Sequence, residues 1–278
     1  MIHQLYPCLW FDNNAKEAAD FYCSVFENSS IVSENPLVVI FQLNGMKFMG
    51  LNGGPRFKIN PSISFFVFHK SEQKLEEQWK KLSAGGQILM PMNKYPWSEK
   101  YGWCQDVYGV NWQLMKDEDE TKNIFPCLMF TKNKAGKAGE AIKFYTSLFQ
   151  NSEIKLLSRY EKGEGDVEGF IKHAQFTLND VLFAAMDSSG PHEFSFNEGV
   201  SIVASCDTQE EIDYLWDTFT KEGEESMCGW LKDKYGVSWQ IVPTVLSELM
   251  NNPEKRDKVM NAFTQMKKFD IEKLEDAA

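Results

Sequence analysis

The sequence has no long apolar run and little positive charge. None of its apolar stretches approaches the roughly 18 residues that a membrane-spanning helix needs. Its 29 basic residues face 40 acidic ones, which gives a net charge of −11. An acidic chain without a basic cluster is a poor partner for phosphate backbones or anionic lipids. We therefore expect no nucleic-acid partner and no membrane association. Residues 1–12 also lack a basic segment followed by an apolar one, so we expect no signal peptide.

Cysteine is sparse and unpatterned. The six cysteines show no Cys-x-x-Cys spacing. Cys8 and Cys127 occupy equivalent positions of a repeated segment, and two copies of one buried strand residue rarely face each other across a disulfide. We therefore expect reduced thiols in a cytoplasmic protein. A hydrophobic content of 43% is ample for a packed core, which excludes a disordered chain.

The chain contains a tandem duplication. Residues 6–31 (YPCLWF…EAADFYCSVFENSSI) return as residues 125–154 (FPCLMF…EAIKFYTSLFQNSEI). Residues 101–115 (YGWCQDVYGVNWQLM) return as residues 228–242 (CGWLKDKYGVSWQIV), and a third block matches between them. Matches in one order indicate two copies of one unit. A residue kept in both copies serves the shared framework or a function that both copies retain.

Hydrophobic periodicity divides each copy into two modules. Apolar residues at helical spacing predict a helix over residues 15–26 and an equivalent one over 138–149. A short strand precedes each helix and β-type runs follow it, two of them joined by a turn at Asn44-Gly45. A strand at 63–68, a helix at about 71–82 and a hairpin within 102–115 repeat the pattern. The sequence therefore predicts an α+β fold of four βαβββ modules in two halves, each a curled mixed or antiparallel sheet with helices outside.

The expected domain boundaries follow the repeats. We assign a first repeat to residues 1–120, a second to 121–243 and a helical tail to 244–278. In the tail, Pro253 after Asn252 predicts a helix start, and Asp270 is suited to cap a final short helix. The first repeat carries an extra segment at residues 88–100 with two prolines and two aromatic residues, which indicate a loop. Such a loop either covers a cleft or is an ordinary surface excursion.

The motifs resemble a known superfamily. Paired βαβββ modules with Phe-Tyr on the first helix and Asp-x-x-Gly-x-x-Trp-Gln at the end resemble the vicinal oxygen chelate superfamily, the glyoxalase and dioxygenase fold. Within it, residues 7–22, 102–114, 228–243 and 261–277 are similar to the PhnB-like, or 3-demethylubiquinone-9 3-methyltransferase-like, branch. The resemblance covers nearly the whole chain. It implies that each pair of modules curls into a cup whose concave wall binds a small molecule.

The resemblance also implies where a metal would be held. In metal-using members, His or Gln on the first strand and Glu on the last strand of each module chelate a divalent ion. The first-strand positions fall here on Pro7 and Pro126, which have no donor side chain, and only the last-strand positions Gln113 and Gln240 are polar. The remaining positions are Met49 or Gly50, Ala184 or Ala185, Ser62 or Ile63, and Gly199 or Val200. A catalytic ion needs about three protein ligands, so we expect no metal and no cofactor.

The methyltransferase in the branch name is not supported by a nucleotide-type motif. Gly53-Gly54 is followed by a predicted strand, and Gly85-Gly86 ends a predicted helix. A nucleotide-type cofactor usually needs a glycine-rich turn from a strand into a helix. We therefore predict no binding site for S-adenosylmethionine.

Strand alternation selects the candidate ligand-binding residues. If Gln113 points into the cup, Asn111 does too, while Trp112 packs beneath the helices. Asp106 and Asp233 precede hairpin glycines and are interpreted as turn-forming carboxylates. The predicted ligand-binding set is Ser62, Ser64, Phe66, Tyr95, Trp97, Trp103, Asn111, Gln113, Trp230 and Gln240. An aromatic cup with serine and amide groups at its base suits a small, partly apolar, uncharged ligand.

Several functions stay open at this point. The favoured hypothesis is a metal-free small-molecule-binding protein, and no catalytic residue is assigned. The alternatives are an enzyme of the superfamily (a lyase, a dioxygenase or the methyltransferase of the branch name) and a scaffold with vestigial cups. A monomer with two pseudo-symmetric halves and a homodimer are both compatible with the sequence. If only one cup functions, we expect the first, because of its extra segment and more polar wall.

Overall fold

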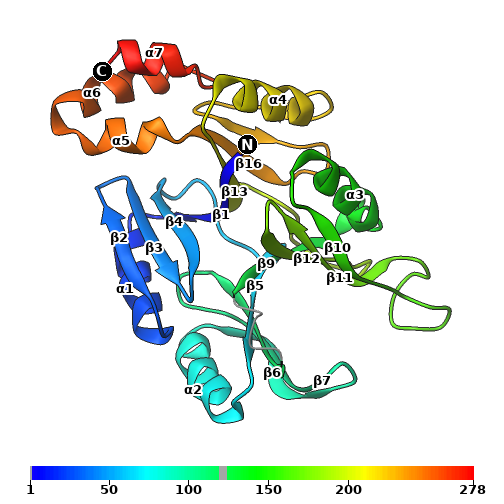
Figure 1. Ribbon diagram of the computed structural model, residues 1–278. Helices are drawn as coiled ribbons and strands as arrows, with labels where there is room; N and C mark the ends of the chain where they lie inside the picture. Colours follow the sequence, from blue (N-terminus) through cyan, green and yellow to red (C-terminus); the bar gives the residue numbers. More distant parts are fainter. Residues whose placement is uncertain (1, 119–123) are drawn as a thin grey trace.

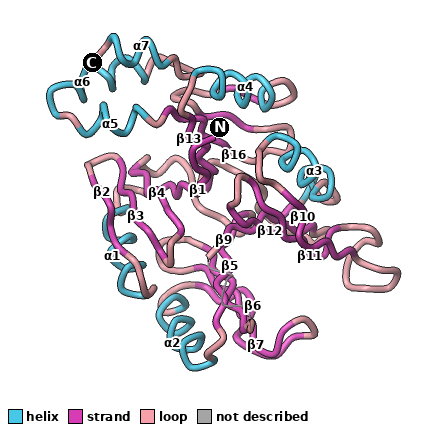
Figure 2. The backbone as a smooth tube through the Cα atoms, viewed as in Figure 1, coloured by secondary structure: helices cyan, strands magenta, loops and turns pink. Residues whose placement is uncertain are grey.

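The computed structural model describes residues 2–118 and 124–278 (Figure 1). The expected fold class is confirmed, because four βαβββ modules build two mixed eight-stranded sheets. The helices lie around the outside of the strands (Figure 2). The first module consists of β1 (Ile2–Phe11), α1 (Ala15–Val25), β2 (Ser30–Glu34), β3 (Val38–Leu43) and β4 (Met46–Asn52). The second consists of β5 (Ile63–His69), α2 (Glu72–Ser83), β6 (Gln87–Tyr95), β7 (Ser98–Gln105) and β8 (Asn111–Lys116).

The second repeat supplies the other two modules. The third consists of β9 (Phe125–Phe130), the 3₁₀ turn η1 (Lys132–Lys134), α3 (Ala138–Leu148), β10 (Glu153–Arg159), β11 (Ile171–Leu178) and β12 (Val181–Asp187). The fourth consists of β13 (Val200–Cys206), α4 (Gln209–Thr220), β14 (Glu224–Glu225), β15 (Trp230–Lys232) and β16 (Ser238–Pro243). The predicted turn between β3 and β4 is confirmed, since Asn44 and Gly45 have φ values of 46° and 85°. A tight hairpin turn needs this left-handed conformation.

Each sheet takes one module from each repeat. Sheet A has the strand order β14-β15-β16-β13-β1-β4-β3-β2 and joins the first and fourth modules. Sheet B has the order β10-β11-β12-β9-β5-β8-β7-β6 and joins the second and third modules. The expectation that each repeat would close a cup of its own is therefore wrong. The first strands of modules meet in antiparallel pairs, β1 with β13 and β5 with β9, and residues 53–62 carry the chain from sheet A to sheet B.

The two faces of each sheet differ in what they bury. The faces that turn toward the helices form the main core, in which Trp112, Trp239, Tyr22 and Tyr145 are fully buried. Burying a large side chain of this kind contributes about 1.5–3 kcal/mol. The opposite faces, here called the inner faces, carry separate apolar clusters. The inner face of sheet B holds the larger cluster, built around Phe66, and that of sheet A holds a smaller one around Cys8.

The extra segment of the first repeat is a hairpin, which corrects the loop expected there. Strands β6 and β7 pair along most of their length and turn at residues 96–97. Pro91 is tolerated in a strand because β6 lies at the edge of sheet B, where one side of the backbone needs no hydrogen-bond partner. Register shifts near Met90 and Asn93 bend the pairing. The prolines of residues 88–100 indicated a loop, but the segment around Pro91 is an edge strand.

The C-terminal tail forms three helices that pack on the fourth module. These are α5 (Val245–Asn251), α6 (Pro253–Phe263) and α7 (Ile271–Asp276). The predicted caps are confirmed, because the side chains of Asn252 and Asp270 accept bonds from Glu254 N and Lys273 N. No helix among residues 2–118 and 124–278 is long and apolar enough to cross a membrane.

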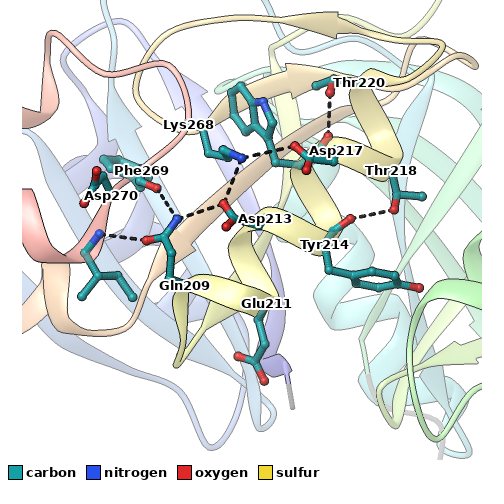
Figure 3. Close-up of polar contacts among 12 residues, drawn as sticks. Gln209, Glu211, Asp213, Tyr214, Asp217, Thr218, Thr220, Lys268, Phe269 and Asp270 are labelled. Atoms are coloured by element: carbon teal, nitrogen blue, oxygen red, sulfur yellow. Dashed lines mark hydrogen bonds and ion pairs between the residues drawn. The ribbon is translucent and has the colours of Figure 1, made fainter.

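Polar contacts attach the tail to α4 (Figure 3). The Lys268 ammonium bridges the carboxylates of Asp213 and Asp217 at 2.9 and 3.2 Å. The Gln209 side chain donates to Phe269 O at 3.0 Å and accepts from Ile271 N at 2.9 Å. A surface cleft of about 650 Å³ lies over these contacts. Because its polar groups already bond one another, we interpret it as the seam where the tail docks.

Candidate functional site

Some of the residues kept in both repeats form the framework beneath the candidate site. Asp106 Oδ1 accepts from Tyr108 N and Val110 N at 2.8 and 3.0 Å, so the predicted role in the turn is confirmed. Its Oδ2 accepts from Tyr22 Oη and Trp112 Nε1, both at 2.8 Å. Burial raises the pKa of Asp106 to about 6, and these hydrogen bonds oppose the rise.

The second repeat reproduces this arrangement. Asp233 Oδ1 accepts from Tyr235 N and Val237 N at 2.8 and 3.1 Å. Its Oδ2 accepts from Tyr145 Oη at 2.6 Å and from Trp239 Nε1 at 2.9 Å. Burial raises the pKa of Asp233 as well. The tyrosine, aspartate and tryptophan of the repeated motifs thus join a helix, a turn and a strand within the main core, away from the inner faces.

A row of inward side chains crosses sheet B. Trp103 on β7 lies opposite Gln113 on β8, Gln113 is beside Phe66 on β5, and Phe66 lies opposite Phe125 on β9. The parallel register of β9 and β12 continues the row to Leu182. All these side chains except Gln113 belong to the inner apolar cluster. The structure therefore brings the predicted Phe66, Trp103 and Gln113 together.

A chain of hydrogen bonds runs through the middle of this aromatic surface. Tyr101 Oη donates to Gln113 Oε1 at 2.5 Å, and Gln113 Nε2 donates to Ser64 Oγ at 2.7 Å. Cys127 lies opposite Ser64 and is fully buried. Burial raises the pKa of the Cys127 thiol to about 12, and hydrogen bonding to Gln113 and Ser64 offsets only part of the rise. The thiol is therefore neutral at physiological pH and is not a ready nucleophile.

One donor on this surface has no partner. Trp103 is 8% exposed, and its Nε1–H forms no hydrogen bond with any of the described residues. The buried Asn111 Oδ1 likewise accepts no hydrogen bond from the described residues, although Asn111 Nδ2 donates to Gly109 O at 3.1 Å. An unsatisfied buried polar group costs about 1–3 kcal/mol, so each of these atoms would gain from a hydrogen-bonding ligand.

The remaining predicted residues of this site lie around the row. Ser62 is buried just before β5, and its backbone N–H donates to Asn60 Oδ1 at 2.9 Å. Tyr95 and Trp97 sit at the tip of the β6–β7 hairpin, and their stacked rings are 5.1 Å apart. Both rings also contact Tyr101, at 5.6 and 5.8 Å between centroids. Trp97 is 54% exposed, so it forms the outer end of the aromatic surface.

Sequence reasoning missed several residues of this surface, including Phe125 of the row. Tyr101 and Cys127 were not selected, although strand alternation from Trp103 and equivalence with Cys8 place them on the inner face. His173 on β11 lies with its ring 5.7 Å from that of Phe66, and its Nε2 is 3.2 Å from Gln175 Nε2. No signal in the sequence associates His173 with Phe66, because the two residues come from different repeats.

The inner face of sheet A has a matching row. Trp230 on β15 lies opposite Gln240 on β16, which is beside Val203 on β13, and Val203 lies opposite Tyr6 on β1. The parallel register of β1 and β4 continues the row to Lys47, whose Nζ is 4.0 Å from the Tyr6 ring centroid. The predicted Trp230 and Gln240 are therefore neighbours, but in the other sheet from Gln113.

Sheet A also repeats the polar centre of sheet B. Gln240 Nε2 donates to Ser201 Oγ at 2.9 Å, and Ser201 lies opposite Cys8. Burial raises the pKa of Cys8 to about 12. All six cysteines are free, which agrees with the expected reduced thiols. The inward residues of β1 and β9 are thus Cys8 and Cys127, not Pro7 and Pro126, so the expected first-strand positions were wrong by one residue.

The corrected positions do not fit a catalytic metal. In sheet B the inward quartet is Cys127, Ser64, Gln113 and Ala184, and in sheet A it is Cys8, Ser201, Gln240 and Met49. The two thiols are protonated. In each sheet the glutamine amide donates a hydrogen bond to the serine hydroxyl, and in sheet B the side chain of Ala184 has no metal-binding atom. A catalytic Zn²⁺ needs about three protein ligands, and a cysteine binds it as the thiolate. Among the described residues, no three His, Cys, Asp or Glu side chains group as a metal site.

Comparisons with known proteins agree with this architecture. The family model described as 3-demethylubiquinone-9 3-methyltransferase matches residues 3–115 and again residues 122–242. A putative 3-demethylubiquinone-9 3-methyltransferase, PhnB protein, from Bacillus cereus is 36% identical over 40% of this chain and 98% of its own, with a TM-score of 0.38. Glyoxalase I from Zea mays is 14% identical over 90% of this chain and 97% of its own, with a TM-score of 0.59, which is a likeness of fold. No curated protein matches the chain.

Proposed function

Because the chain belongs to the 3-demethylubiquinone-9 3-methyltransferase (PhnB-like) family of the glyoxalase-like superfamily, we propose that it binds a small molecule on the inner face of sheet B without a metal. The ligand is uncharged and partly apolar, and it carries a hydrogen-bond acceptor. It lies against Phe66, Phe125 and Trp103, with Gln113 and Tyr101 as its polar contacts. We further propose a cytoplasmic location, because a reducing compartment keeps free thiols reduced.

The observation that carries this proposal is the unpartnered Trp103 Nε1–H. A donor enclosed among aromatic side chains loses its hydrogen bond to water and gains none from the described residues. A ligand oxygen that accepts this bond restores it and covers the ring at the same time.

The chemistry of the inward side chains favours binding over the reactions of the superfamily. A lyase or dioxygenase of this fold needs a metal, and the donors of both quartets do not fit one. For methyl transfer, Gly53 and Gly54 lead from β4 toward β5, and Gly85 and Gly86 lead from α2 into β6. Neither pair enters a helix as a nucleotide-binding turn does.

The proposal is tested by native mass spectrometry and elemental analysis of freshly purified protein. We expect one retained neutral molecule per chain and no stoichiometric transition metal. The ligand should be retained by the matched control Trp230→Phe and lost from Trp103→Phe, since phenylalanine keeps the ring and removes the donor. Gln113→Ala should likewise weaken binding of the isolated ligand by about tenfold or more, whereas Gln240→Ala should change it little.

Other outcomes would contradict the proposal. A stoichiometric metal that is present in the wild type and lost in Gln113→Ala would instead support a metal-dependent enzyme. Equal losses of ligand from Trp103→Phe and Trp230→Phe would mean that sheet B is not the preferred site. Trp97→Ala tests the contribution of the hairpin tip apart from that of the row. We expect it to weaken binding less than Gln113→Ala does, because the Trp97 ring is half-exposed.

A further inference from the structure

The inner faces of the two sheets carry different side chains on the strands of the third module in sheet B and of the first module in sheet A. At the end of the sheet B row stand Phe125 and Leu182, and the equivalent positions of sheet A carry Tyr6 and Lys47. The alignment of the repeats fixes this equivalence, because Cys127 and Ala184 correspond to Cys8 and Met49 in the same strands. Sheet A has thus replaced an apolar corner by a hydroxyl and an ammonium group.

Lys47 lacks a counter-ion. Its Nζ contacts Gln4 Oε1 at 3.3 Å and the face of the Tyr6 ring at 4.0 Å. Within residues 2–118 and 124–278, no carboxylate lies within ion-pair distance of it, whereas surface lysines such as Lys74 and Lys94 have carboxylate partners. The side chain is half-buried, and burial lowers the pKa of Lys47. A partly desolvated ammonium without a carboxylate is destabilising unless an anion binds to it.

Partly exposed apolar side chains surround Lys47 on the inner face of sheet A. Met49, Leu51 and Val242 pack on the inner cluster of sheet A and remain partly exposed. At the far end of the face the rings of Trp10 and Trp230 meet edge to face with centroids 5.8 Å apart. A molecule lying across this face meets the ammonium at one end and aromatic or aliphatic groups along its body.

We propose that the inner face of sheet A is a second binding site, which takes a small organic carboxylate with an apolar body. The carboxylate pairs with Lys47, and the body lies over Met49 and Leu51 toward Trp230. A single cation balances a single negative charge, which favours a carboxylate over a doubly charged phosphate or phosphonate. This site is independent of the neutral site proposed for sheet B, and the two would let one chain bind two different ligands.

The experiment compares benzoate with benzamide, which have the same ring and differ in charge. Titration calorimetry of the full chain should give saturable benzoate binding at low ionic strength, weakened by salt. Lys47→Met keeps the aliphatic stem and removes the charge, and we expect it to weaken benzoate binding at least tenfold without changing benzamide binding. The matched control Lys155→Met removes an exposed lysine of sheet B that pairs with Glu153, and it should leave benzoate binding unchanged.

Three results would overturn the inference. These are the absence of saturable benzoate binding to the wild-type chain, equal affinity for benzoate and benzamide, and a change of less than about twofold in Lys47→Met. Lys47→Met removes a partly buried charge and is not expected to unfold the protein, which a thermal melt checks. Phenylphosphonate is the third probe, and tighter binding of it than of benzoate would contradict the single-charge argument. Because none of these probes requires the sheet B ligand, failure here leaves the proposal for sheet B standing.

Discussion

Sheet A and sheet B present the same row of five inward positions, and the rows agree at one end and differ at the other. Both begin with a tryptophan and a glutamine from the hairpin of the repeated motif. They end in Tyr6 and Lys47 in sheet A, and in Phe125 and Leu182 in sheet B. The duplication therefore kept the hairpin wall and varied the opposite one. At that opposite wall sheet A carries a hydroxyl and an ammonium group where sheet B carries two apolar side chains.

The largest expected effect concerns what the two repeats share. Asp106→Ala and Asp233→Ala each leave a buried tyrosine hydroxyl and a buried indole N–H without an acceptor. We expect each substitution to lower the free energy of unfolding by about 3–5 kcal/mol, measured by urea denaturation. The exposed Asp12→Ala is the control. Losses that differ by more than about 1 kcal/mol between the repeats would show that the frameworks are not equivalent.

The same two carboxylates give a dependence on pH. The pKa of Asp106 rises from 3.8 in the unfolded chain to about 6 in the folded one, so the folded state holds this proton more tightly. Its contribution to stability is then present below about pH 4 and lost as the pH rises toward 6, by roughly 3 kcal/mol. The stability difference between wild type and Asp106→Asn should fall over this range. Asp233→Asn should show the same sign, and an opposite slope would contradict the role of burial.

Exchanging the variable corner sharpens the contrast between the sheets. Leu182→Lys introduces an ammonium into the apolar cluster of sheet B and should destabilise the protein by about 2 kcal/mol. Lys47→Leu makes the reverse change in sheet A and should stabilise the protein by about 1 kcal/mol. Both are measured by urea denaturation without added ligand. If Lys47→Leu is destabilising instead, the ammonium contributes to folding and is not reserved for an anion.

The smallest expected effect separates the two tryptophans of the rows. In the absence of ligand, Trp103→Phe loses ring area but also removes the unpartnered N–H, and these effects oppose each other. We expect a change in unfolding free energy of less than about 1 kcal/mol. Trp230→Phe should likewise change stability by less than about 1 kcal/mol, because its ring is less enclosed. A loss of several kcal/mol for Trp103→Phe would mean that its N–H has a partner in solution.

The sequence predicted local structure well and the assembly of modules poorly. Helical spacing located the apolar face that begins at Ala15, and alternation placed Gln113 and Trp112 on opposite faces, because both patterns are local. No local pattern records which strand lies beside β1, since its inward residues suit either neighbour. The first-strand error at Pro7 and Pro126 has a related cause, because a shift of one residue exchanges the two faces of a strand.

The candidate site was predicted in part for the same reason. Ser64, Phe66, Trp103 and Gln113 lie within one module, so alternation alone brings them to one face. Cys127, Phe125 and His173 come from the other repeat and join them only through the β5–β9 pairing. The edge strand β6 was taken for a loop, because proline and bulges resemble loop composition when the position of a strand in its sheet is not known.

The interleaved sheets have a consequence for the order of folding. Sheet B closes between neighbouring modules, where Ser64 meets Cys127, whereas sheet A closes only when Cys8 meets Ser201 near the other end of the chain. Contacts between distant residues form late because loop closure opposes them. During synthesis the β1 strand must wait for β13 with its edge unpaired, a state prone to aggregation. Pulse-labelled hydrogen exchange should find amides of β5 and β9 protected before those of β1 and β13, and simultaneous protection would mean that the two sheets form as one unit.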